Sequence, residues 1–167
     1  MNRLRNFLAI SVLSFVSLGV NAEVLSGYCG AYGENITWIL DTETGILTIE
    51  GTGLMVLGNN CGWQYYRNSI KEVNIGDGVT DISERAFYGC SEIRTISTPS
   101  SLTTIGAYAF YNCSKMNSIN IPPKVNKIGN NAFRGCYSLE SIALPEYLDC
   151  IESSVFSGCN SLNSGAV

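Results

Sequence analysis

Residues 116–136 read MNSINIPPKVNKIGNNAFRGC, and the chain from residue 69 onward repeats this pattern. The phenylalanine and the cysteine near the end of the stretch recur every 23 residues, since 110 − 87, 133 − 110 and 156 − 133 all equal 23. A fixed period of about 20 to 29 residues is typical of a solenoid of stacked units. The columns in register include Phe87, Phe110, Phe133 and Phe156; Cys90, Cys113, Cys136 and Cys159; Ile82, Ile105, Ile128 and Ile151; and Val79, Leu102, Val125 and Leu148.

Each unit predicts two short strands and a closing turn. Apolar and polar residues alternate between positions 116 and 121, which is typical of a strand with one buried face. Pro122 then ends that strand, because proline cannot donate to a strand ladder. The apolar pair at 125 and 128 predicts a second strand or turn, and residues 130–136 predict one helical or 3₁₀-like turn. Such a coil buries its apolar columns only against its neighbours.

The repeat closely resembles the BspA-like class of leucine-rich repeats, and the resemblance covers Ser69 to Val167. The stretch before it is similar to the amino-terminal cap of that family. Residues 36–41 and 46–50 flank a turn at 42–45 and predict a β-hairpin. We therefore expect an α/β repeat solenoid that is mostly β: a right-handed leucine-rich-repeat coil with 23-residue repeats, short helical turns and an N-terminal β-hairpin cap.

The chain divides into three predicted segments. Residues 1–22 combine a basic start, an apolar run from Phe7 to Val20 and small residues at the end, which is typical of a secretory signal peptide. Residues 23–68 form the cap, and residues 69–167 form the solenoid of four repeats with a partial fifth. We expect the protein to be secreted or held at the cell surface.

Composition argues against several classes of function. The net charge is −4, and removal of Arg3 and Arg5 with the signal peptide leaves 8 basic and 14 acidic residues, or 8 − 14 = −6. An acidic chain without a basic cluster is a poor binder of phosphate backbones, so we expect no nucleic-acid partner. The chain contains no histidine, the commonest general base and a frequent zinc ligand. We expect no enzyme activity, no metal site and no cofactor.

The seven cysteines fall into three groups. The column Cys90, Cys113, Cys136 and Cys159 is interpreted as buried structural thiols, although neighbouring coils also lie within disulfide range. Cys29 and Cys61 bracket the cap hairpin and are candidates for a stabilising disulfide in an exported protein. Cys150 shares its column with polar residues, so it is expected to point outward as a candidate free thiol.

The predicted binding surface consists of the polar residues between the buried columns of the first strand. These residues are small and mostly uncharged, so they offer hydrogen bonds and few aromatic or arginine anchors. They are Glu72, Asn74, Thr95, Ser97, Ser118, Asn120 and Ser141. The family resemblance implies an adhesin that binds proteins, such as host matrix or cell-surface proteins.

A carbohydrate-binding module is the alternative function. Trp63, Tyr65 and Tyr66 could stack on sugars, or they could pack over the open end of the first coil. The carboxyl end carries no polar cap after the partial fifth unit, so self-association through that end is a further expectation.

Overall fold

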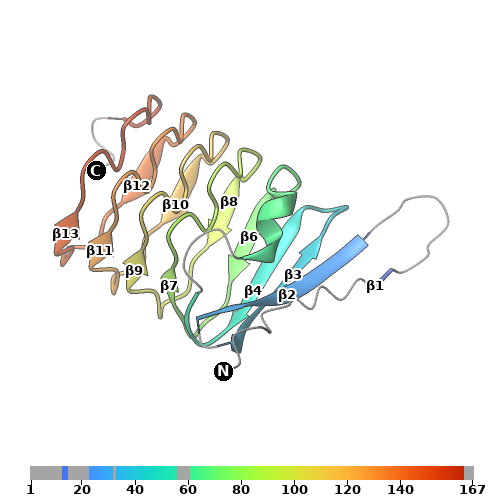
Figure 1. The fold of residues 1–167 in the computed structure, drawn as a ribbon. Helices are drawn as coiled ribbons and strands as arrows, with labels where there is room; N and C mark the ends of the chain where they lie inside the picture. Colours follow the sequence, from blue (N-terminus) through green and yellow to red (C-terminus); the bar gives the residue numbers. More distant parts are fainter. Residues whose placement is uncertain (1–12, 15–22, 32, 56–60, 164–167) are drawn as a thin grey trace, which may run out of the picture.

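The computed structural model describes residues 13–14, 23–31, 33–55 and 61–163. It is a row of coils that leads away from an antiparallel cap at the amino-terminal end (Figure 1). The cap contains β2 (Glu23–Gly30), β3 (Gly33–Asp41) and β4 (Ile46–Gly51). β3 and β4 form the predicted hairpin, whereas β2 was not predicted.

The segment predicted to be a signal peptide lies outside the described residues except for β1 (Leu13–Ser14). This two-residue strand pairs antiparallel with the start of β2, at Glu23 and Val24.

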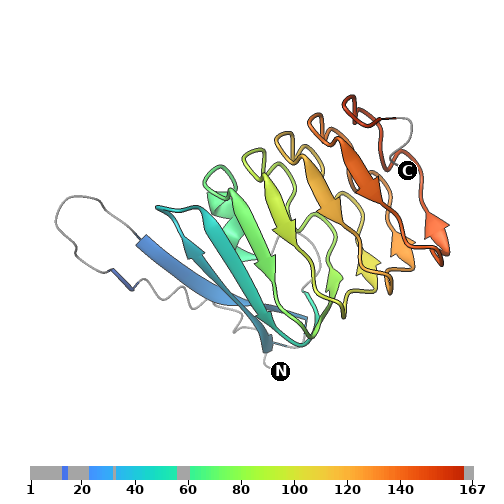
Figure 2. The same cartoon turned by 180° about the vertical axis from the view of Figure 1, so that it is seen from behind.

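The first strands of the coils form one side of the solenoid. They are β6 (Glu72–Ile75), β8 (Thr95–Ser97), β10 (Ser118–Asn120) and β12 (Ser141–Ala143). β4 pairs in parallel with β6, β6 with β8, and β10 with β12, while β8 and β10 lie side by side (Figures 1 and 2). The cap hairpin is therefore continuous with the repeat sheet.

The second strands form a separate parallel sheet on another side of the coils. Its members are β5 (Gly53–Leu54), β7 (Val79–Ile82), β9 (Thr104–Ile105), β11 (Lys127–Ile128) and β13 (Cys150–Ile151). Partners along this sheet are 23 residues apart, as in the pair Lys127 and Cys150. The spacing from β5 to β7 begins at 26 residues, in the pair Gly53 and Val79, because the cap precedes the regular period.

The turns that close the coils line a third side. One is the 3₁₀ helix η1 (Gly62–Tyr66), and the segments near residues 83–90, 106–113, 129–136 and 152–159 are turns. In the turn at residues 83–90, the backbone N–H groups of Ala86, Tyr88 and Cys90 donate to carbonyls three residues earlier. Those of Phe87 and Gly89 donate to carbonyls of the next coil. The turns thus have 3₁₀-like bonds but do not extend into helices.

Backbone conformation explains why these turns stay short. Two positions in each of the four turns after η1 have positive φ, for example Asn131 at 55° and Gly135 at 77°. A left-handed residue breaks a right-handed helix and redirects the next N–H group. The predicted repeat solenoid is confirmed. The short helical turns that the sequence predicts are the 3₁₀ helix η1 and these interrupted turns.

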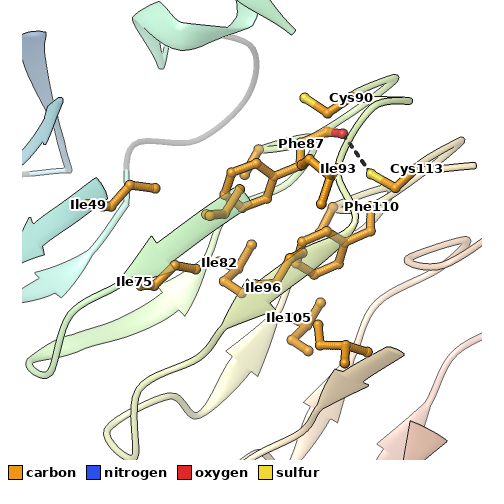
Figure 3. Close-up of a cluster of buried hydrophobic side chains, with 14 of the residues drawn as sticks. Ile49, Ile75, Ile82, Phe87, Cys90, Ile93, Ile96, Ile105, Phe110 and Cys113 are labelled. Atoms are coloured by element: carbon orange, nitrogen blue, oxygen red, sulfur yellow. Dashed lines mark hydrogen bonds between the residues drawn. The ribbon is translucent and has the colours of Figure 1, made fainter. Parts of the chain in front are cut away.

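The core consists of columns of equivalent apolar side chains from successive coils (Figure 3). Phe87, Phe110 and Phe133 are fully buried, and successive rings lie 5.3 Å apart between centroids with nearly parallel planes. Trp63 continues the stack into the cap, 5.8 Å from Phe87, and contacts Trp38 edge to face at 5.9 Å. One core therefore joins the cap to the repeats.

Glycines allow the coils to approach closely at one column. A Cβ atom added to Gly129 would lie 2.5 Å from the Ala107 backbone nitrogen. We predict that Gly129→Ala lowers the free energy of unfolding by about 1–3 kcal/mol, as expected for overpacking against the backbone. Gly76→Ala is the matched control, since its added Cβ would meet nothing closer than 3.3 Å. Equal losses in urea unfolding for the two variants would contradict this explanation.

Candidate functional site

The outward side chains of the first sheet form one continuous surface, which we call the β face. One row runs across the strands from Ile39 to Thr48 to Asn74 to Ser97, and Asn120 pairs with Ala143 on the following strands. A second row runs from Ile46 to Glu72 to Thr95, and Ser118 pairs with Ser141. Alternation along each strand places these side chains opposite the buried columns. The β face therefore spans both the cap and the repeats.

All seven residues of the predicted binding surface lie on the β face. Thr95, Ser97, Ser118, Asn120 and Ser141 are exposed, and Glu72 and Asn74 are half-buried. Asn74 Nδ2 donates to Glu72 Oε1 over 3.0 Å, which holds this pair in a fixed arrangement. The remaining positions carry exposed hydroxyl and amide groups at regular intervals, and the Ser118 hydroxyl donates to Asn117 Oδ1 over 3.3 Å.

Sequence reasoning missed the apolar end of this surface. Tyr28 on β2 and Ile39 on β3 are 44% and 51% exposed and lie on the same face, since Tyr28 pairs with Thr37 and Ile39 with Ser26. Ile39 sits in an apolar run, but its neighbours Trp38 and Leu40 are buried, so strict alternation places Ile39 outside. That alternation was available in the sequence; the strand that carries Tyr28 was not predicted.

The cap aromatics occupy different environments. Trp63 is fully buried and donates from Nε1 to the Ala86 carbonyl oxygen over 2.9 Å, so it presents no face to a ligand. Tyr66 is partly buried against the core, and Tyr65 is 83% exposed. Of the three residues proposed for sugar stacking, Trp63 thus acts as a packing residue.

The cysteine column lies inside the solenoid. Cys113 Sγ donates to the Phe87 carbonyl oxygen over 3.3 Å, and Cys136 Sγ donates to the Phe110 carbonyl oxygen over 3.2 Å (Figure 3 shows the first bond). Cys159 Sγ makes the same bond to Phe133 over 3.2 Å at the half-buried end. Each of these three thiols bonds to the backbone of the preceding coil.

Burial changes the acidity of these thiols. It raises the pKa of Cys90 to about 12, against a partial lowering by the Arg67 guanidinium. Burial likewise raises the pKa of Cys113 and of Cys136. Thiolate is the reactive form of cysteine, so these three residues are unsuited to nucleophilic chemistry.

The remaining cysteines are placed differently. Cys29 and Cys61 are both buried, and the hydrogen bond to the Cys61 thiol, followed by burial, raises the pKa of Cys29. Both are free thiols in this structure. Cys150 is exposed on β13. Among the cysteines, Cys150 is thus the most accessible to reagents, Cys159 is half-buried, and the other five are buried.

The described part of the chain contains no group of three or more acidic or cysteine side chains arranged to hold a metal ion. Within the same ranges, no helix is both long and apolar enough to cross a membrane.

Comparison with known proteins assigns this architecture to a family. The family model described as "BspA type Leucine rich repeat region", with six copies, matches residues 60–166. The chain belongs to this family. No match was found in the search of curated proteins.

Two solved bacterial structures show the same fold as this BspA-type chain. A leucine-rich repeat protein from Eubacterium ventriosum is 23% identical with a TM-score of 0.61, over 83% of this chain and 42% of that one. The leucine-rich repeat protein of T. pallidum is 24% identical with a TM-score of 0.58, over 75% and 65% of the two chains. This chain spans less than two thirds of either protein, and at these identities the likeness concerns the fold.

The buried thiols predict a loss of stability at alkaline pH. A cysteine in the unfolded chain ionises near pH 8.5, whereas Cys90 and Cys113 in the folded chain stay protonated to much higher pH. Above about pH 8.5 the folded state therefore binds more protons than the unfolded state. The stabilisation is complete below the unfolded pKa and is lost as pH rises. We expect the free energy of unfolding to fall by about 1.4 kcal/mol per pH unit for each buried thiol between about pH 9 and 12.

Urea unfolding under reducing conditions at several pH values measures this slope. Cys113→Ala should give a shallower slope by about one proton, whatever its effect on stability at neutral pH. Cys150→Ala is the matched control, because it removes an exposed thiol outside the buried column. Identical slopes in the wild type and in Cys113→Ala would exclude this explanation.

Proposed function

We propose that this protein is secreted or displayed at the cell surface and binds other proteins through the β face, acting as an adhesin-type interaction module and not as an enzyme. The observation that supports the proposal is the continuity of the β face from the cap through the repeats. Repeat solenoids use such extended surfaces for binding.

The composition of the β face suits a modest, distributed interaction. Its repeat part carries hydroxyl and amide groups, and its cap end carries the exposed side chains of Tyr28 and Ile39. Large apolar and aromatic residues contribute most of the energy of an interface, whereas small polar residues chiefly add complementarity. We therefore place the energetic anchor at the cap end and the hydrogen-bonding contacts along the coils.

A panel of matrix proteins and intact host cells tests this function. Asn120→Arg places a long charged side chain in the centre of the β face and should reduce binding by about tenfold or more, a loss typical of a disrupted interface centre. Asn126→Arg is the matched control, because it makes the same change at an exposed asparagine of the same coil away from the β face. Ile39→Asp should also weaken binding.

The outcomes of this experiment separate clearly. Loss of binding in Asn120→Arg and Ile39→Asp with retention in Asn126→Arg supports the β face as the site. Failure of the wild-type chain to bind any member of the panel, or equal loss in all three variants, would contradict the proposal.

We also propose that Cys29 and Cys61 form a disulfide in the exported protein. Their thiols are in hydrogen-bonding contact inside the cap core, directly beneath the strand that presents Tyr28. Oxidation removes two protons and two electrons from the thiols and passes them to a disulfide oxidant, which is itself reduced to two thiols. The bond would fix the cap end of the β face.

Mass spectrometry after treatment with oxidised glutathione tests this pairing. We expect a cross-linked peptide that joins residues 29 and 61, and a gain in stability of about 3–4 kcal/mol from the chain-entropy estimate for a loop of this size. Cys29→Ser should abolish both effects, whereas Cys150→Ser should change neither. A dominant bond between two members of the cysteine column would contradict the pairing.

A further inference from the structure

The turn side carries a compact cluster of one arginine and three tyrosines on two neighbouring coils, Arg85, Tyr88, Tyr108 and Tyr111, which we call the turn-side cluster. The Arg85 guanidinium lies over the Tyr108 ring, 5.3 Å from its centroid. Tyr108 contacts Tyr111 with centroids 5.8 Å apart, and Tyr111 stacks on Tyr88 at 4.8 Å with nearly parallel rings. Arg85 and Tyr88 are exposed, and the other two rings are half-buried.

Two members of this cluster occupy unfavourable backbone positions. Arg85 has a φ of 57° and Tyr108 a φ of 56°, in a column where the next coils have Asn131 and Ser154. Glycine and asparagine adopt this left-handed conformation most readily, whereas long side chains are disfavoured there. Neither side chain belongs to the buried core. Backbone strain of this kind clusters at functional sites.

The charge on the turn side differs from that of the whole chain. The chain carries a net charge of −4, yet the turn segments 106–114 and 129–137 contain no Asp or Glu. Arg67 and Arg134 lie on this side with Arg85, because Arg67 contacts the position of Gly89 and Arg134 donates to Asn131. The acidic side chain next to the cluster, Glu84, pairs with Arg85 over 3.2 Å. Glu152, in the last turn, pairs with Lys127 over 3.1 Å, so the three arginines leave this side with a small excess of positive charge.

We infer that the turn-side cluster is a second binding site, separate from the β face, for an acidic segment of a polypeptide. Stacking covers one ring face each of Tyr88 and Tyr111, and Arg85 covers one face of Tyr108, so the cluster also offers ring edges, phenol hydroxyls and the guanidinium N–H groups that Glu84 does not engage. Ring edges are electropositive, and guanidinium binds carboxylate through two parallel hydrogen bonds. These groups match carboxylates and backbone carbonyls.

An NMR titration of the full chain with a Glu-Gly repeat peptide at about 10 mM ionic strength tests this site, since electrostatic attraction is screened little there. A Gln-Gly repeat peptide and hyaluronan are the comparison ligands. We expect the acidic peptide to shift the resonances of the turn-side cluster most. Arg85→Asn and Tyr108→Asn should each weaken its binding about tenfold, the loss typical of an interface anchor.

The substitutions also separate binding from folding. Asparagine tolerates positive φ, so both variants should keep or raise the melting temperature, whereas residues with a purely structural role would lower it. Arg94→Asn removes the same charge from an exposed arginine next to β8 and should change the affinity by less than about twofold, as expected for a charge outside the contact.

Several results would overturn the inference. These are the absence of shifts in the turn-side cluster with the acidic peptide, equal weakening by Arg94→Asn, a lower melting temperature in both cluster variants, or tighter binding of hyaluronan than of the peptide. Because the β face is not changed in these variants, loss of this site and loss of β-face binding are distinguished by the matrix-protein panel.

Discussion

In-register stacking of coils is the constraint on which the rest of this structure depends. Backbone bonds join neighbouring coils on three sides, as in the pairs Lys127 and Cys150 on the second sheet and Phe110 N–H with the Ala132 carbonyl on the turn side. A coil that shifted by one residue would lose these bonds and move its buried columns to the surface. Each buried position must therefore repeat, and the freedom to vary is confined to positions that face solvent.

The same constraint explains the chemistry of the core. The phenylalanines of neighbouring coils stack on one another, as Phe87 and Phe110 do. The cysteine three residues after each phenylalanine donates to the phenylalanine carbonyl of the preceding coil, as Cys113 does to Phe87. That carbonyl also accepts from the Cys90 backbone N–H. The thiol is small enough to be buried and still supplies a weak donor, which an aliphatic side chain of similar size does not. Cysteine in this column therefore needs no catalytic explanation.

The repeats could be predicted from sequence because each apolar column recurs with its neighbours, and the position of the seven proposed binding residues on one face followed from the same alternation. The cap was harder to predict. The apolar run around Ile39 hides its own alternation, and β2 has no counterpart in the repeat. The turn-side cluster could not be foreseen, because positive φ at Arg85 and Tyr108 is a property of the folded turn that neither residue type indicates.

The β face and the turn-side cluster differ in how closely they follow the 23-residue repeat. On the β face, successive coils present similar small polar groups, so a partner that slides by one coil meets nearly the same contacts and the repeat part alone gives little specificity. The cap end and the turn-side cluster break the period, through Tyr28 and Ile39 in one case and Arg85 with Tyr108 in the other. Specific recognition by a repeat protein requires such departures, since only a position that is not repeated can define the register of a bound partner.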